Sequence, residues 1–175
     1  LDTQSDGFTG WVIFRYAEAL LNYAEAKAEL GTLTQGDIDI SIRLLRERVG
    51  MPNLDLANIE NDPNWNFPDL SPALNEIRRE RRVELIGEGF RWDDIARWAA
   101  ADELIINQRP LGAKFKNVDY PELSAEDYSL TNGYFDPLKE QLPNGFGFRP
   151  DRDYLSPIST VELNLNPQLE QNPGW

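Results

Sequence analysis

Near the start of the chain, mainly apolar and small residues recur every three to four positions, which is the spacing of one face of an α-helix. Between residues 11 and 30 they form two stripes: Tyr16, Leu20, Tyr23, Lys27 and Leu30, and Ala17, Leu21, Ala24 and Ala28. The many alanines favour a helix and let a neighbouring helix approach closely. Because Gly31 offers a C-cap directly afterwards, the pattern predicts a helix from Trp11 to Leu30.

A second helix is predicted after a short turn. Thr34 and Asp37 have the spacing of a capping box, and apolar residues then follow helical spacing up to Gly50. A short connection makes two helices antiparallel neighbours, so residues 11–50 are predicted to form a helix hairpin like one tetratricopeptide unit. One such pair cannot bury both of its apolar faces. We therefore expect partner helices in a part of the protein before residue 1.

A second pair of helices is predicted over residues 72–99. Ser71 followed by Pro72 supplies an N-cap and a proline at the first helical position, and the apolar spacing continues to about Ile86. Gly87 and Gly89 interrupt the chain before a further helix. That helix places Trp92, Ile95, Ala96 and Ala99 on one side.

The prolines divide the chain into regular and irregular parts. All twelve lie within residues 52–72 or 110–173, and proline is excluded from helix interiors. The fold class predicted is therefore mostly α, with helix hairpins followed by a loop-rich region over residues 110–175. Long loops of this kind are usually functional or packed over a scaffold.

Composition excludes several classes of function. The chain contains no Cys and no His, which removes thiolate chemistry, zinc sites and Ser-His-Asp triads. Its net charge of −13 argues against nucleic acid as a partner. No apolar run is long enough to span a membrane. Carboxylate chemistry, hard-cation sites and non-covalent binding remain.

The segment of residues 76–98 differs from the rest of this acidic chain because it carries six arginines and six acids. One interpretation is a site for an anion or an acidic sugar. The favoured interpretation is a structural hub of ion pairs between helices, formed by Arg81, Glu84, Arg91, Asp94 and Arg97. Removing one partner of a buried pair strands a charge, so Arg81→Ala or Glu84→Ala is expected to unfold the protein.

Loop aromatics are the candidate ligand contacts, because flat rings stack on the apolar faces of sugars. Trp65, between two asparagines, is the first candidate. Three tyrosines in the loop-rich region follow: Tyr120, Tyr128 and Tyr134. The alternative is that these rings anchor their loops. Trp92 and Trp98 are predicted to pack in the core and Trp175 to anchor the terminus.

The carboxylates give weaker signals. Asp93 and Asp94 point about 100° apart on a helix, which is unsuitable for an acid/base pair. Asp94 is expected to face Arg91 or Arg97, and Asp93 to pair with Arg97. Asp151 and Asp153 could donate oxygens to calcium, although this pattern is more often a turn. No metal or cofactor is predicted.

Several segments resemble the motifs of the SusD/RagB family, in the family's own order. The first is RYAEALLNYAEA at residues 15–26, and the central one is ERRVEL followed by EGFRWDDIARW at residues 80–98. The remaining segments are RERVG at 46–50, YLSPI at 154–158 and QNPGW at 171–175. The resemblance extends from about Trp11 to Trp175, so residues 1–175 are interpreted as one C-terminal region of a larger SusD-like fold.

The resemblance implies a function and a location. Family members are lipoproteins on the outer face of the outer membrane, with tetratricopeptide-like helix pairs. They bind glycans or other nutrients, act with a SusC-like TonB-dependent transporter, and are not enzymes. The lipid attachment would lie on an N-terminal portion outside this sequence. Two alternatives stay open: an architectural segment that docks to the transporter without its own ligand site, and a carboxylate-dependent glycoside hydrolase.

Overall fold

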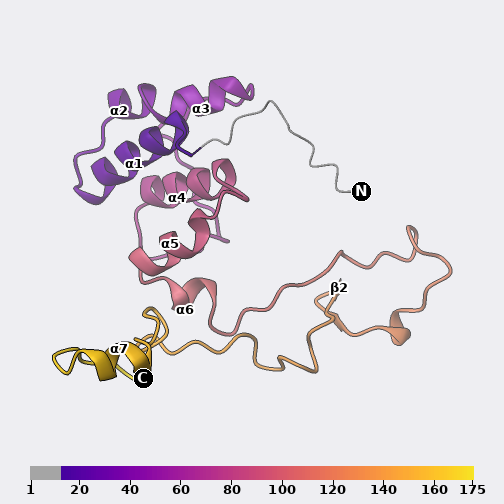
Figure 1. Cartoon of the computed structure of the whole chain (residues 1–175). Coiled ribbons are helices and arrows are strands. Elements are labelled where there is room, and N and C mark those ends of the chain that lie inside the picture. Colours follow the sequence, from indigo (N-terminus) through magenta and orange to yellow (C-terminus); the bar gives the residue numbers. More distant parts are fainter. Residues whose placement is uncertain (1–12) are drawn as a thin grey trace, which may run out of the picture. The chain divides into compact units, whose positions relative to one another are not determined.

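The computed structural model describes residues 13–175 and is mostly helical, which confirms the predicted fold class (Figure 1). The predicted helix start at Trp11 lies outside the described residues. The chain divides into two compact units, Leu1–Arg91 and Trp92–Trp175, and each is described by itself.

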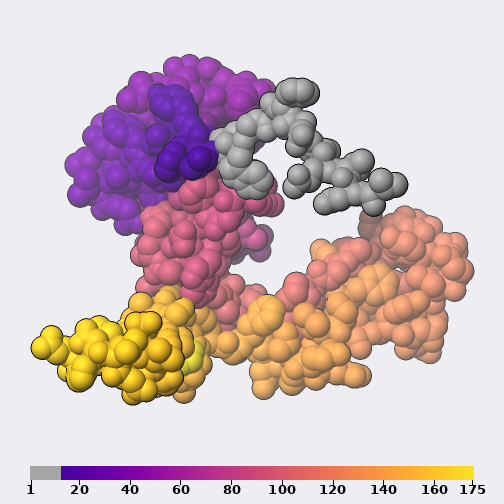
Figure 2. Space-filling view, in the orientation of Figure 1, coloured from indigo at the N-terminus to yellow at the C-terminus, as the bar shows by residue number. Residues whose placement is uncertain are grey.

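Four helices make up most of the first unit: α1 (Tyr16–Glu29), α2 (Gln35–Asp39), α3 (Ile42–Arg48) and α4 (Pro72–Glu84). In Figure 2 the indigo-to-magenta atoms of this unit form one compact mass. The apolar core is wholly buried at Leu21, Ala24, Ile38, Ile42 and Ile77. It is contributed by helices that the sequence pattern identified, with α1 packed against α3 and α4.

The two stripes predicted for the first helix have different outcomes. Ala17, Leu21 and Ala24 of the second stripe are buried. In the first stripe Leu20 is also buried, whereas Tyr16 and Leu30 are 73% and 74% exposed. Helix α1 begins at Tyr16, and Arg15 before it is extended, with φ −117° and ψ 144°. The helix ends at Glu29, and Gly31 follows with φ +66°, a conformation that glycine adopts without strain.

The single second helix predicted up to Gly50 is wrong, because the structure divides it into α2 and α3. The predicted capping box at Thr34 and Asp37 is confirmed at the start of α2. The break follows at Ser41, whose hydroxyl donates a 2.5 Å hydrogen bond to the carbonyl of Asp37. A serine side chain that bonds to the backbone four residues earlier competes with the regular helical pattern and bends the chain.

Helix α4 closely follows the prediction. The hydroxyl of Ser71 accepts a hydrogen bond from the backbone N–H of Leu74, and Pro72 occupies the first helical position. The helix ends at Glu84, two residues before the predicted end. Gly87 and Gly89 follow with φ of +79° and +89°.

Helix α5 (Phe90–Arg97) begins at the end of the first unit, and the second unit continues with α6 (Ala101–Leu104), a 3-10 turn (Ala125–Asp127), a small hairpin and α7 (Thr160–Leu165). The hairpin pairs β1 (Leu130–Thr131) antiparallel with β2 (Tyr134–Phe135). Two predictions here are wrong: Ala99 has φ +50° beyond the end of α5, and Trp92 is 47% exposed. Trp92 contacts the ring of Phe148, at 6.2 Å between centroids.

A buried ion pair organises the loops of the second unit. Asp136 is 1% exposed and accepts hydrogen bonds from Arg109 and from the hydroxyl of Thr131. Next to it, the ring of Phe135 makes edge contacts with Phe115 and Tyr128. These contacts give a loop-rich region a small core of its own.

Two further contacts join distant segments within the second unit. Gly145 has φ +73°, and a Cβ atom there would lie 2.3 Å from the carbonyl carbon of Asn107. At the chain end, the indole of Trp175 donates to the carbonyl of Leu155 and lies under the guanidinium of Arg152. These contacts are those of the terminal anchor predicted for Trp175. Among residues 13–175, no helix has both the length and the apolar character needed to cross a membrane.

Candidate functional site

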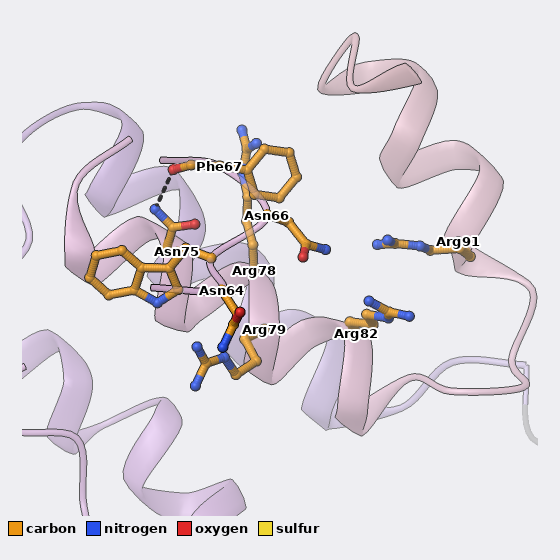
Figure 3. A pocket seen from close by; sticks show the side chains of 9 residues that line it. Asn64, Asn66, Phe67, Asn75, Arg78, Arg79, Arg82 and Arg91 are labelled. Atoms are coloured by element: carbon orange, nitrogen blue, oxygen red, sulfur yellow. Dashed lines mark hydrogen bonds between the residues drawn. The ribbon is translucent and has the colours of Figure 1, made fainter. Parts of the chain in front are cut away.

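The candidate site lies on the connection between α3 and α4, which covers residues 49–71. This connection is held to α4 by Asn75, a residue only 3% exposed. The side-chain amide of Asn75 donates to the carbonyl of Phe67 at 2.7 Å (Figure 3). It also donates to the carbonyls of Leu70 and Ser71 at 3.3 Å. A buried amide with this many partners fixes the course of the loop.

Two recesses lie along this loop. The first, which we call the larger recess, has a volume of about 600 Å³ and lies along the first part of the loop. It is lined by residues 52–55 and 58–63 together with Arg46, Glu76 and Arg79. Its volume falls in the range of small-molecule sites, roughly 300–1,000 Å³. Asparagine amides and aspartate carboxylates in this wall offer both donors and acceptors for hydroxyl groups.

Carboxylates of the larger recess are held in their charged form by hydrogen bonds. The Asn58 side chain, followed by the backbone N–H of Ala57, lowers the pKa of Asp55. The backbone N–H of Asn64, followed by Arg79, lowers the pKa of Asp62. Both groups are therefore acceptors at neutral pH.

A smaller recess, of about 120 Å³, lies beside the second part of the loop (Figure 3). We refer to it as the arginine recess. It is lined by residues 64–67 and by Asn75, Arg78, Arg79, Arg82 and Arg91. Phe67 is buried and lies under the guanidinium of Arg78, 4.6 Å from it.

The two recesses share Arg79 in their walls. Arg79 binds Asp62 at 2.5 Å and Glu76 at 3.2 Å. The indole N–H of Trp65 donates to the same Glu76, at 3.4 Å. Trp65 thus lies in the wall of the arginine recess and is bonded to a carboxylate of the larger recess, so the two cavities are adjacent parts of one surface.

The sequence-predicted aromatics fall in different units. Trp65 lies in the first unit at the recesses, whereas Tyr120, Tyr128 and Tyr134 lie in the second. Tyr128 packs on Phe135, and Lys114 lies over the ring of Tyr134. All three tyrosines are partly exposed, at 37–42%. Their role as ligand contacts remains a prediction.

The predicted structural hub is distributed over several separate contacts. Arg81 is 4% exposed, donates to the side-chain oxygen of Asn22 at 2.8 Å and lies over the ring of Phe90. Glu84 binds Arg15 at 2.8 Å and Arg48 at 2.7 Å. These contacts join α4 to the start of α1 and to the end of α3.

The remaining hub residues behave differently from one another. Asp94 is buried and pairs with Arg97 at 2.9 Å, as one of the two predicted arrangements has it. The predicted pair of Asp93 with Arg97 does not form within the described chain, where Asp93 is exposed. Arg91 lines the arginine recess.

The calcium alternative has a simpler structural interpretation. Asp153 accepts a hydrogen bond from the backbone N–H of Arg149 and binds the guanidinium of Arg152, which is the arrangement of a turn. These contacts lower its pKa, the side chain of Arg152 contributing most. Within residues 13–175, no group of three or more Asp, Glu, His or Cys side chains gathers to hold a metal.

The sequence alone does not distinguish the arginines that line the recess from those that pack against other helices. Arg78, Arg79 and Arg82 follow i, i+1 and i+4 spacing on α4, which places them along one side of the helix. That spacing was readable, and an anion site was one interpretation of the segment. The fold adds the asparagine-rich loop that closes the recess over them.

Comparisons with known proteins agree with one another. A sequence model of the SusD family matches residues 3–175. A SusD-like protein of Formosa agariphila is 36% identical over 97 residues, which cover 55% of this chain and 18% of that protein. The solved structure of selenomethionine BT4246 superposes with a TM-score of 0.67 and 33% identity, over 94% of this chain and 24% of that one. The chain thus spans about a quarter or less of these relatives' length.

Proposed function

Because the chain belongs to the SusD family, we propose that it is part of a cell-surface protein that captures a glycan or a related nutrient. Capture is non-covalent and leaves the ligand unchanged. The ligand then passes to a SusC-like TonB-dependent transporter in the outer membrane. The protein itself is held at the outer face of that membrane by a lipid on its N-terminal portion.

The observation that carries the binding proposal is the larger recess. Its volume of about 600 Å³ suits one or two sugar rings. Its wall combines amide donors with aspartates held in the charged form, and sugar hydroxyls need both kinds of partner. Trp65, next to it, supplies a flat ring within reach of the same ligand.

The aspartates of the larger recess suit a role as hydrogen-bond acceptors for sugar hydroxyls. Among the described residues, each aspartate with a resolved shift has its pKa lowered, and Asp55 and Asp62 in the recess are two of them. Such groups accept hydrogen bonds from hydroxyls and are poor proton donors.

Calorimetric titration of the intact protein against a panel of polysaccharides tests this function. Heat of binding without new reducing ends supports capture. New reducing ends would identify an enzyme. Absence of heat with every polysaccharide would favour the architectural alternative, in which this region completes a scaffold for transporter docking.

The role of Trp65 is tested with the polysaccharide that binds. Trp65→Ala is expected to weaken binding by roughly fivefold, because an aromatic contact contributes on the order of 1 kcal/mol. Trp92→Ala is a matched control, since that half-exposed indole lines neither recess. Equal affinities of the two variants would contradict a ligand contact by Trp65.

A further inference from the structure

The wall of the arginine recess has a one-sided charge. Four arginines line it (Arg78, Arg79, Arg82 and Arg91), and the other lining residues are three asparagines, Trp65 and Phe67. No carboxylate is among the residues that line this cavity, although the whole chain has a net charge of −13. Like charges gathered in a concave, partly apolar site create a local potential that attracts an anion.

Two of these arginines are balanced by carboxylates outside the recess. Arg78 binds Glu29 of α1 at 2.9 Å. Arg79 binds Asp62 and Glu76, which belong to the wall of the larger recess. These pairs fix the positions of both guanidinium groups in the wall of the recess.

Arg82 differs from these two. It is exposed, and no carboxylate of the described chain lies within ion-pair distance of its guanidinium. In Figure 3, Arg82 extends from the end of α4 and Arg91 from the start of α5, toward the same side of the recess. Asn66 points toward them from the loop. An arginine with a structural role normally ends on a carboxylate or a carbonyl, whereas Arg82 ends at a cavity.

From this arrangement we propose that the arginine recess binds an anionic substituent of the captured sugar, either the carboxylate of a uronic acid or a sulfate ester. The inference rests on the proposed function and narrows its ligand to acidic glycans. Guanidinium forks match both oxyanions by paired N–H···O hydrogen bonds. The amides of Asn64 and Asn66 add neutral donors to the same oxygens.

The size of the recess decides which part of the ligand enters it. A volume of about 120 Å³ equals the space of roughly four water molecules. That space accommodates a carboxylate or a sulfate group and excludes a chain of sugar rings. The ring that bears the group would lie toward the larger recess, across Arg79, which lines both cavities, and beside Trp65, whose indole N–H is bonded to Glu76 of the larger recess.

The test compares charged polysaccharides with their neutral counterparts on the intact protein. The probes are polygalacturonate with its carboxyl-reduced form, and carrageenan with its desulfated form. Binding is measured by calorimetry at low salt and at 0.5 M NaCl. A charged probe is expected to bind about tenfold more tightly than its neutral form, the difference contributed by one charge-assisted hydrogen-bonded contact, and to lose most of that advantage at high salt.

Arg82→Gln is the variant that reports on the recess. It is expected to lower the affinity for the charged probe by roughly tenfold and to leave the neutral form unchanged. Arg43→Gln is the matched control, because Arg43 lies on α3 in an ion pair with Glu47 and lines neither recess. Thermal melting of both variants shows whether each is folded. The charged-against-neutral comparison of the unsubstituted protein needs no variant at all.

The outcomes separate the two proposals. A preference for one charged probe that Arg82→Gln removes supports the inference and identifies carboxylate or sulfate as the group. Equal binding of charged and neutral forms overturns the inference and leaves glycan capture standing. An equal loss in Arg82→Gln and Arg43→Gln also overturns it, since net charge alone would then explain the preference. Absence of binding to every polysaccharide overturns both.

Discussion

At the scale of single residues, Arg81 and Arg82 show how adjacent side chains of one type divide between structure and surface. Arg81 is 4% exposed and bonded to Asn22, whereas Arg82 is exposed at the arginine recess. Arg81 follows Leu74 and Ile77 at helical spacing, and all three side chains are buried. The chemistry at Arg82 could not be predicted in the same way, because it depends on a loop whose course no periodicity describes.

This division gives a direct comparison of stability. Arg81→Ala is expected to lower the free energy of unfolding by about 3 kcal/mol, since it removes a buried hydrogen bond and the stacking on Phe90. Arg82→Ala is expected to change it by less than about 0.5 kcal/mol. Urea unfolding of the two variants measures both values. Similar losses in the two would contradict the separate roles.

Asp37 gives a prediction for acid stability. Hydrogen bonds from the side chain of Thr34, and then from Tyr23, lower its pKa to about 2. A folded-state pKa below the ordinary value means that the carboxylate stabilises the fold above about pH 4, and that this contribution is lost as the pH falls toward 2. The difference in unfolding free energy between the unsubstituted protein and Asp37→Asn should therefore shrink over that window. Asp69→Asn, at an exposed loop position, is the control for the change in charge.

At the scale of elements, the sequence predicted which segments are helical better than where they end. Helix α4 was readable from Ser71 and Pro72, because capping and proline chemistry are local. The break between α2 and α3 could not be predicted in this way. It depends on the buried hydroxyl of Ser41, which bonds to the backbone carbonyl of Asp37. The start of α1 shifted for a related reason, since Arg15 is extended and reaches Glu84 and Glu88 far along the chain.

Helix α1 allows its two stripes to be compared by mutation. Leu21→Ala is expected to cost about 2–5 kcal/mol, because Leu21 is completely buried against the other helices. Leu30→Ala is expected to cost less than about 0.5 kcal/mol, because Leu30 is 74% exposed. Thermal or urea unfolding of the intact protein measures both. A large loss for Leu30→Ala would indicate that another part of the protein covers this side chain.

At the scale of the whole molecule, the two units differ in how they are held together. The first has a continuous apolar core shared by α1, α2, α3 and α4. Among the described residues, the second unit contributes only Ile95, Ala100 and Ala101 to the buried apolar set. Its loops depend instead on the Arg109–Asp136 pair and on edge contacts between rings.

Hydrogen exchange should reveal this difference. Amides of α1 and α4 are expected to exchange only with large-scale opening. Amides of residues 107–148 are expected to exchange through local openings of much lower free energy, because few apolar contacts resist them. Mass spectrometry of peptides from the intact protein measures both sets. Equal protection in the two would mean that polar contacts hold the loops as firmly as the apolar core holds the helices.

The close backbone contact at Gly145 limits which residues can occupy this position as the sequence evolves. A Cβ atom there would lie 2.3 Å from the backbone of Asn107, and backbone atoms have no alternative rotamer to adopt. Every substitution at this position therefore requires two segments to separate. As related sequences diverge, the loops on either side are expected to vary. The residue at this position is expected to remain glycine, so that the same two backbone segments stay in contact in distant relatives.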